Sequence, residues 1–305
     1  RLADEGFAVS SALADSLNGI LCEPELPAGF RAAFGSPHAD RPWSPGDRLV
    51  QPELARTLEL IAESGPDAFY TGPIADTLVA EMQRGGGFIT HDDLRGYEAK
   101  VRTPIRGTYR GFTVYGPPPP SSGGITLVEM LNMLETFDLR RYERFDPRTV
   151  HLMTEVMRRA YRDRAAYLGD ADFVPIPAYL TEKAYARELA ETIDPEHATP
   201  SASLAGTIPL TAEGTDTTHF SIIDADGFAV SNTYTLEQSY GARVVVGGAG
   251  FLLNNEMGDF NWKPGHTDRE GRIGTRANLI APGKRMLSSQ TPVIVTRDGR
   301  VQIVT

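Results

Sequence analysis

Thr217-Thr218-His219-Phe220-Ser221-Ile222-Ile223-Asp224 alternates between polar and apolar side chains, as a half-buried β-strand does. Asp226-Gly227 follows it as a signal for a two-residue hairpin turn. Residues 228–236 then predict a returning strand. The sequence therefore predicts a β-hairpin with Thr217 at its first residue.

A second polar cluster comes shortly after this hairpin. Residues 247–253 form a glycine-rich corner and an apolar run, and Asn254-Asn255-Glu256-Met257-Gly258-Asp259-Phe260 follows. A threonine at the start of a hairpin, with acids and amides behind it, suits a nucleophile site. A hydroxyl is a weak nucleophile until a base activates it, and a free N-terminal amine on the same threonine can be that base.

Several motifs together resemble the γ-glutamyltranspeptidases, which are N-terminal-nucleophile hydrolases. Residues 217–220, 252–260 and 263–265 (Thr-Thr-His-Phe, Leu-Leu-Asn-Asn-Glu-Met-Gly-Asp-Phe and Lys-Pro-Gly) resemble the start of that family's small subunit. Pro-Pro-Ser-Ser-Gly-Gly at 119–124 and the Asp163-Arg164 segment that continues to Asp170 resemble its large subunit. The combination is far more specific than any one motif.

The resemblance implies an α+β fold, the four-layer αββα sandwich. It assigns residues 1–216 to the C-terminal part of the large subunit and residues 217–305 to the N-terminal part of the small subunit, in one intertwined domain. It also implies that the chain is cut at both ends. The family's carboxylate-binding arginine is expected before Arg1, and the glycine pair of the oxyanion hole is expected after Thr305.

The same resemblance implies the catalytic roles. The Thr217 hydroxyl is expected to cleave the precursor between Asp216 and Thr217, and then to carry a γ-glutamyl ester that water or an amine resolves. Thr235 is expected to bond near this nucleophile. On the residues alone, either threonine is an ordinary strand residue, because threonine favours strands.

Substrate-binding roles fall on six residues: Glu237, Asn255, Glu256, Asp259, Ser288 and Ser289. Two acids three positions apart suit a substrate's α-ammonium group, although a solvated acidic loop has the same pattern. By resemblance, the serine pair holds the α-carboxylate; the alternative is a plain turn or strand start. Glu237 stands where many relatives have asparagine, and Asn255 orders the loop.

Composition excludes several other classes. The formal net charge of −10 argues against a nucleic-acid partner. Cys22 is the one cysteine, so no internal disulfide forms, and its surroundings predict an inert packed thiol. The six histidines show no metal-ligand spacing, so we expect no metal and no cofactor. No apolar run approaches the roughly 18 residues of a membrane span.

The rest of the chain predicts helices before the hairpin and strands after it. Helices are expected over residues 2–17, 52–62, 74–84, 125–135, 150–168 and 180–193, and strands within 105–115, over 292–296 and over 301–305. Four arginines at 158, 159, 162 and 164 predict a solvated helix face. Residues 194–214 predict a flexible connector.

The expected function is γ-glutamyl transfer and hydrolysis, with a small γ-glutamyl substrate, and an amino acid, a peptide or water as acceptor. The resemblance also implies two subunits of one precursor, and it implies that the protein acts in the periplasm, outside the cell or at its surface. One alternative is a glutaryl or cephalosporin acylase that uses the same Thr217. Another is a non-catalytic binding protein of the same fold.

Overall fold

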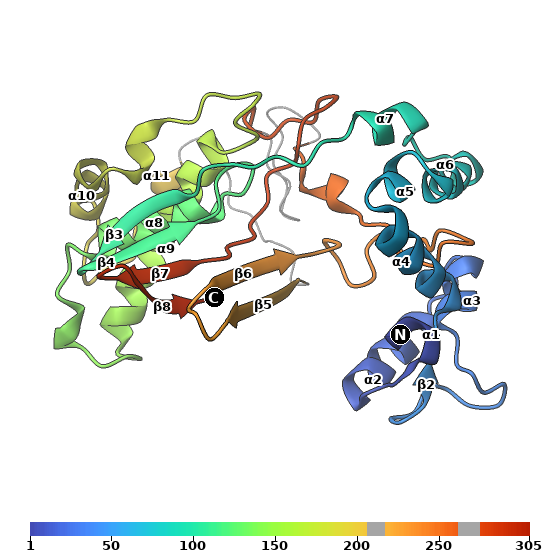
Figure 1. Cartoon of the computed structure of the whole chain (residues 1–305). Coiled ribbons are helices and arrows are strands. Elements are labelled where there is room, and N and C mark those ends of the chain that lie inside the picture. The colour runs from blue at the N-terminus through green and yellow to red at the C-terminus, as the bar shows by residue number, and fades with distance from the viewer. Residues whose placement is uncertain (206–216, 262–274) are drawn as a thin grey trace. The chain divides into compact units, whose positions relative to one another are not determined.

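The computed structural model describes residues 1–205, 217–261 and 275–305 (Figure 1). Contacts within the chain define two compact units. The first contains residues 1–100 and 238–255, and the second contains residues 101–237 and 256–305. These units differ from the two subunits predicted on either side of Thr217. That division concerns where a precursor is cut, so it stays a prediction.

The first unit is mainly helical. Its elements are α1 (Leu2–Glu5), β1 (Phe7–Ala8), α2 (Ser11–Leu21), α3 (Ala28–Phe34), β2 (Arg48–Leu49), α4 (Pro52–Ser64), α5 (Asp67–Tyr70), α6 (Pro73–Gly85) and α7 (His91–Gly96). The predicted helices over 52–62 and 74–84 are confirmed as α4 and α6. Each has proline at its start, where the missing N–H costs nothing.

The single helix predicted over residues 2–17 is wrong, because the chain leaves it at Gly6. Gly6 has φ 73°, and a Cβ there would lie 2.7 Å from the carbonyl oxygen of Leu49 on the paired strand. The next helix begins after Ser10, whose hydroxyl accepts a hydrogen bond from the Leu13 N–H at 3.2 Å. Strand pairing and a new cap therefore override the apolar pattern.

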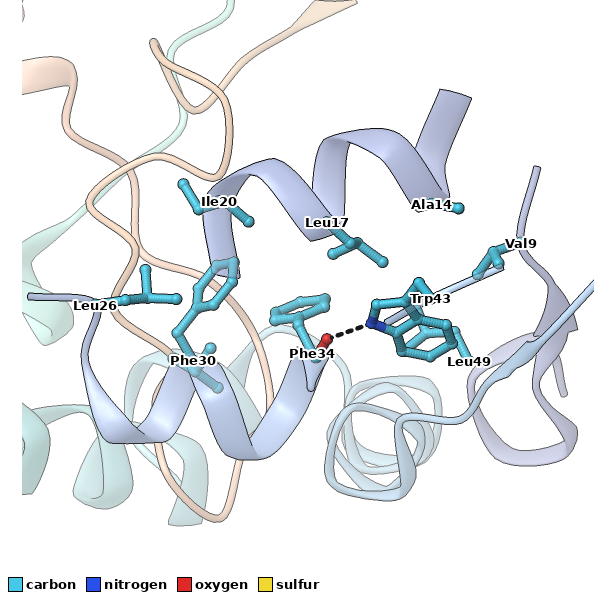
Figure 2. Packing of buried hydrophobic residues seen from close by; sticks show 10 residues of the cluster. Val9, Ala14, Leu17, Ile20, Leu26, Phe30, Phe34, Trp43 and Leu49 are labelled. Atoms are coloured by element: carbon cyan, nitrogen blue, oxygen red, sulfur yellow. Dashed lines mark hydrogen bonds between the residues drawn. The ribbon is translucent and has the colours of Figure 1, made fainter. Parts of the chain in front are cut away.

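The core of this unit joins α2, α3 and the segment after them. Figure 2 shows Trp43 packed beside Leu17 and Phe34, with the indole Nε1 donating to the Phe34 carbonyl oxygen at 2.8 Å. Helix α3 is not among the helices that the sequence predicts. Its two phenylalanines, Phe30 and Phe34, are both buried. Cys22 is exposed rather than packed, because it lies at the end of α2.

The second unit combines helices with strands. Its elements are β3 (Ile105–Tyr109), β4 (Phe112–Gly116), α8 (Gly123–Leu134), η1 (Leu139–Arg141), α9 (Pro147–Tyr167), η2 (Ala178–Thr181), α10 (Lys183–Glu191), α11 (Ser201–Ala205), β5 (Thr218–Ile223), β6 (Ala229–Tyr234), η3 (Glu256–Asp259), β7 (Ile294–Arg297) and β8 (Arg300–Val304). None of the helices described here or in the first unit is long and apolar enough to cross a membrane.

Four strands form an antiparallel sheet in the order β3-β4-β7-β8. Helix α8 follows β4 directly and packs against the sheet (Figure 1). The approach is close at its start, since a Cβ on Gly116 would lie 2.7 Å from the Cα of Gly124. Glycines at the end of β4 and the start of α8 thus place the helix start directly on the sheet.

The hairpin β5–β6 is confirmed, but its turn is longer than predicted. The N–H of Asp224 donates to the carbonyl oxygen of Phe228, so three residues rather than two form the turn. The Asp224 carboxylate accepts hydrogen bonds from the N–H groups of Asp226 and Phe228 at 3.0 and 2.8 Å. Gly227 supplies the left-handed residue, with φ 85°.

One side chain of β6 connects the hairpin to the four-stranded sheet. The Ser231 hydroxyl donates to the carbonyl oxygen of Thr305 at 2.7 Å and accepts from the N–H of Val293 at 3.1 Å. Val293 precedes β7 and Thr305 follows β8. Figure 1 shows the hairpin beside β7 and β8. This contact places the middle of β6 beside the segment before β7 and the end of β8.

The solvated arginine face predicted for residues 158–164 is wrong in part. Arg159 is 1% exposed and Arg164 is buried as well. Arg159 donates to the buried Glu155 carboxylate at 2.7 Å and to the carbonyl oxygen of Thr192 at 2.8 Å. A buried guanidinium needs a carboxylate partner inside the protein. The charge pattern along the sequence does not show which arginine has such a partner.

Candidate active site

Thr217 lies immediately before β5, opposite the residue that follows β6. Thr218 pairs with Tyr234, so the antiparallel register places Thr217 across from Thr235. The Thr217 Oγ1 donates to the Thr235 Oγ1 over a long 3.4 Å. Thr217 is exposed and Thr235 is half-buried. The hairpin thus brings together the two hydroxyls predicted to be catalytic.

Glu237 is placed beside these hydroxyls by an unusual backbone conformation. Its φ is 77°, a left-handed value that non-glycine residues rarely adopt. Its N–H donates to the Thr235 Oγ1 at 2.8 Å. Its carboxylate lies next to Gly258, since a Cβ on that glycine would be 3.7 Å from the carboxylate carbon. The bend after β6 therefore directs this acid towards the η3 turn.

Two further acids lie in η3, as the sequence predicts. Glu256 is 8% exposed and Asp259 is half-buried. Burial, followed by the negative charges of Asp259 and Glu237, raises the pKa of Glu256 to about 7. The Glu237 carboxylate next to Gly258 and the two acids of η3 therefore form one acidic cluster. Such a cluster favours a cationic group of a ligand.

The serine pair lies on a segment held by the start of α8. The carbonyl oxygen of Ser288 accepts two hydrogen bonds from Ser122, one from its N–H at 2.8 Å and one from the Ser122 hydroxyl at 2.9 Å. The Ser288 N–H donates to the Pro120 carbonyl oxygen at 3.0 Å. Buried Arg164 donates through Nε to the Ser122 Oγ at 2.9 Å. These bonds fix the peptide that joins Ser288 to Ser289. Ser289 itself is exposed.

Asn278 connects the acidic turn to the serine segment, and the sequence alone did not reveal it. Its Nδ2 donates to the carbonyl oxygen of Asp259 at 2.5 Å, and its Oδ1 accepts from the Leu287 N–H at 2.9 Å. No motif or spacing singles this residue out.

Residues 216 and 263–265, used in the sequence argument, lie outside the described residues. Asn255 belongs to the other compact unit, where its Oδ1 accepts from the Gln238 N–H at 3.2 Å.

Among residues 1–205, 217–261 and 275–305, no group of three or more histidine, cysteine or acidic side chains is arranged to hold a metal ion. One acid of the cluster, Glu237, is connected through its backbone N–H to the Thr235 hydroxyl. The arrangement can present a nucleophilic hydroxyl, a negative subsite and a serine-rich segment.

The sequence model of the family described as Gamma-glutamyltranspeptidase matches residues 1–305. This chain belongs to the γ-glutamyltranspeptidase family. It is 47% identical over 308 residues to a glutathione hydrolase proenzyme of Escherichia coli (strain K12), covering 100% of this chain and 53% of that protein. It is 50% identical over 262 residues to the glutathione hydrolase proenzyme of Pseudomonas aeruginosa (PAO1), covering 85% of this chain and 46% of that protein.

A solved member of the wider group has a similar structure. The crystal structure of a cephalosporin acylase from Bacillus halodurans matches with a TM-score of 0.81 and 26% identity, over 100% of this chain and 53% of that one. The predicted family and α+β class, with the fold of the N-terminal-nucleophile hydrolases, are confirmed. The chain spans about half the length of the γ-glutamyltranspeptidase relatives that it matches.

Proposed function

We propose that the protein transfers γ-glutamyl groups from γ-glutamyl amides, glutathione among them, to water or to an amine. The observation that carries this proposal is the position of the Thr217 hydroxyl, 3.4 Å from that of Thr235 and on the same hairpin that directs Glu237 towards η3. A nucleophilic hydroxyl and a subsite for a cationic group suit a γ-glutamyl donor. The relatives named as glutathione hydrolase proenzymes support the same substrate class.

The same hydroxyl would act twice. In the precursor, the Thr217 oxygen attacks the carbonyl carbon of Asp216, the peptide C–N bond breaks, and the amine of Thr217 becomes free. Water then hydrolyses the resulting ester, so Asp216 ends one subunit and Thr217 begins the other. The new amine can take the proton of the Thr217 hydroxyl in the second reaction.

In the mature enzyme, the Thr217 oxygen attacks the γ-carbonyl carbon of the substrate. The amide C–N bond breaks, the leaving amine takes up a proton, and a γ-glutamyl ester remains on Thr217. Water resolves the ester to glutamate, whereas an amino acid or a peptide amine gives a new γ-glutamyl amide. Both resolving reactions return the proton to the Thr217 oxygen.

Substrate recognition would divide between two sets of residues. The carboxyl groups of Glu237, Glu256 and Asp259 would bind the α-ammonium, because opposite charges attract strongly where water is partly excluded. The segment of Ser288 and Ser289 would bind the α-carboxylate through hydroxyl and backbone donors. Asn255 is proposed to order the loop that precedes η3.

A second candidate is a glutaryl or cephalosporin acylase. The similarity to the cephalosporin acylase of Bacillus halodurans favours it. A glutaryl group has no α-ammonium, however, and it gains nothing from the cluster of Glu237, Glu256 and Asp259. We therefore rank the γ-glutamyl donor first.

The test begins with the full-length protein and its Thr217→Ala variant. Intact mass and N-terminal sequencing should find two polypeptides in the wild type, one of them starting at Thr217, and a single uncut chain in the variant. The cut enzyme should then hydrolyse γ-glutamyl-p-nitroanilide faster than glutaryl-p-nitroanilide. The reverse preference supports the acylase, and a folded wild type that stays uncut supports a non-catalytic binding protein.

We also propose that the protein acts in the periplasm, outside the cell or at its surface. The proposal rests on the resemblance to enzymes that work there. Cell fractionation with a periplasmic and a cytoplasmic marker enzyme tests it, and co-purification with the cytoplasmic marker would contradict it.

A further inference from the structure

Asn278 joins the two segments proposed to bind substrate. The side chain is 5% exposed, and its two ends bond to Asp259 at 2.5 Å and to Leu287 at 2.9 Å. Asp259 ends η3, and Leu287 directly precedes Ser288. We propose that Asn278 is a positioning residue that sets the spacing between the ammonium-binding acids and the carboxylate-binding serines. This inference rests on the proposed function.

The amide of Asn278 has one orientation that satisfies both neighbours. The Asp259 carbonyl oxygen can only accept a hydrogen bond, and the Leu287 N–H can only donate one, so the Nδ2 and Oδ1 atoms cannot exchange places. Leu287 is buried. Losing the amide would leave buried backbone groups without these partners, which is costly. Each segment is thus bound to a different end of one short, planar group.

The backbone that carries Asn278 is itself held in place. Its carbonyl oxygen accepts from the Asn261 N–H at 2.8 Å, and the preceding carbonyl oxygen, of Ala277, accepts from the Lys284 Nζ at 2.7 Å. Gly169 lies directly against this segment, because a Cβ there would be 2.3 Å from the Ala277 carbonyl oxygen. Asn278 therefore acts from a fixed base.

The chemistry of the ligand explains why a fixed spacing matters. In an α-amino acid group, the ammonium and the carboxylate are attached to one carbon, so their separation cannot adapt to the site. A ligand gains from binding at two subsites only when their spacing matches its own. Asn278 would therefore favour ligands that carry both groups. A 4-aminobutyryl amide lacks the carboxylate, uses one subsite and does not depend on the spacing.

The experiment compares these two substrates in the full-length, self-cleaved protein. We would measure kcat and KM for γ-glutamyl-p-nitroanilide and 4-aminobutyryl-p-nitroanilide, in the wild type and in Asn278→Ala. The matched control is Asn261→Ala. Asn261 is also 5% exposed, and its Nδ2 bonds to the carbonyl oxygen and hydroxyl of Thr275 at 2.7 and 3.1 Å.

We expect Asn278→Ala to lower kcat/KM for the γ-glutamyl substrate about tenfold, mainly by raising KM. For the 4-aminobutyryl substrate, kcat/KM should change by about twofold or less. The ratio of kcat/KM for the γ-glutamyl substrate to kcat/KM for the 4-aminobutyryl substrate should stay at the wild-type level in Asn261→Ala. An equal loss on both substrates, or the same change of ratio in the control, would overturn the inference, because Asn278 would then be a general structural residue.

A second variant covers the case in which Asn278→Ala does not fold. Asn278→Asp has nearly the same shape and keeps an acceptor for the Leu287 N–H, but when ionised it cannot donate to the Asp259 carbonyl oxygen. It should lower the ratio as well, and an unchanged ratio would refute the spacing role. A wild type without γ-glutamyl activity would instead refute the proposed function and the inference together.

Discussion

The hydroxyl of Thr217 lies 3.4 Å from the hydroxyl of Thr235, across the open end of the β5–β6 hairpin. Thr235 also accepts the N–H of Glu237 at 2.8 Å. The proposed nucleophile and an acid of the proposed substrate subsite therefore meet at one hydroxyl group. We propose that Thr235 orients the Thr217 hydroxyl, and mutation can test this role.

Thr235→Ala should slow self-cleavage and substrate hydrolysis by roughly tenfold or more, because a misplaced nucleophile loses its aligned geometry. Thr235→Ser keeps the hydroxyl and should recover most of the rate. Self-cleavage is followed by the appearance of the small subunit on gels, and hydrolysis by release of p-nitroaniline. Thr233→Ala is the control, since that hydroxyl bonds to His219 on the same hairpin. Equal losses in both alanine variants would argue against the orienting role.

Glu256 should give substrate binding a distinct pH dependence. Burial and the charges of Asp259 and Glu237 raise its pKa to about 7, so the carboxyl group is mainly protonated below pH 7 and ionised above it. The ionised form binds an α-ammonium better. KM for a γ-glutamyl substrate should therefore fall as pH rises from about 6 to about 8. The stability of the free protein should change in the opposite direction. Because folding raises the pKa of Glu256, the stability that this group contributes is lost as pH rises through about 7.

Glu256→Gln should abolish this pH dependence and raise KM at pH 8 by about tenfold, or ~1.4 kcal/mol. Glu237→Asn removes one of the negative neighbours and should move the midpoint to lower pH. Michaelis profiles at half-unit pH intervals measure both effects. If the Glu256→Gln profile keeps the wild-type midpoint, another group is responsible for it.

Ser122→Ala should weaken substrate binding more than chemistry. The change removes the hydroxyl that accepts from the Arg164 Nε and donates to the Ser288 carbonyl oxygen, each at 2.9 Å. We expect KM to rise about threefold to tenfold with kcat within about twofold, as for the loss of one or two hydrogen bonds. Ser201→Ala serves as control, because the Ser201 hydroxyl accepts at 3.1 Å from Arg158, which lies on α9 as Arg164 does. A fall in kcat without a rise in KM would contradict the binding role.

Arg159→Met should destabilise the fold by about 3–5 kcal/mol, because it removes the buried guanidinium that pairs with the buried Glu155 carboxylate and leaves Arg158 to bond to it alone among the arginines. Denaturant unfolding at pH 7 measures this loss. Arg148→Met, which removes an arginine whose side chain is 62% exposed, should cost no more than about 1 kcal/mol. A loss in Arg159→Met as small as in this control would mean that the buried pair contributes little.

The same pair makes an acid-sensitive contribution to stability. Burial raises the pKa of Glu155, but hydrogen bonds from Thr199, Arg159 and Arg158 outweigh it and lower the pKa to about 2. A lowered pKa stabilises the fold above the ordinary carboxyl value and loses this effect as pH falls towards 2. The melting temperature should therefore fall more steeply between pH 7 and pH 3 for the wild type than for Glu155→Gln. Equal slopes would exclude this carboxylate as the cause.

Local signals predicted many of the elements correctly. The helices predicted over 52–62 and 74–84 are present as α4 and α6, and prolines at 52 and 73 lie in their first turns. The hairpin strands are present with the expected partners, and α8 begins in the glycine pair that follows Ser121 and Ser122. In each case the deciding interaction lies within a few residues of the signal.

Predictions failed where distant residues decided the outcome. The helix expected over 2–17 is interrupted by pairing of Phe7–Ala8 with Arg48–Leu49. Arg159 is buried because Glu155 and Thr192 satisfy it inside the protein. Asn278 carries no local signal, since its two partners lie 19 and 9 residues away in the chain.

The sequence by itself determined the family, and it predicted the nucleophile, the acids and the serines of the candidate site, because these depend on residue type and short spacing. Only the tertiary structure decided that Thr235 accepts from both Thr217 and Glu237, and that Asn278 connects the acidic turn to the serine segment. It also decided that burial and the charges of Asp259 and Glu237 raise the pKa of Glu256. Hydrogen bonds and charge interactions of this kind act over a few ångströms in space. Folding brings such partners together from distant parts of the chain, so their spacing in the sequence does not reveal them.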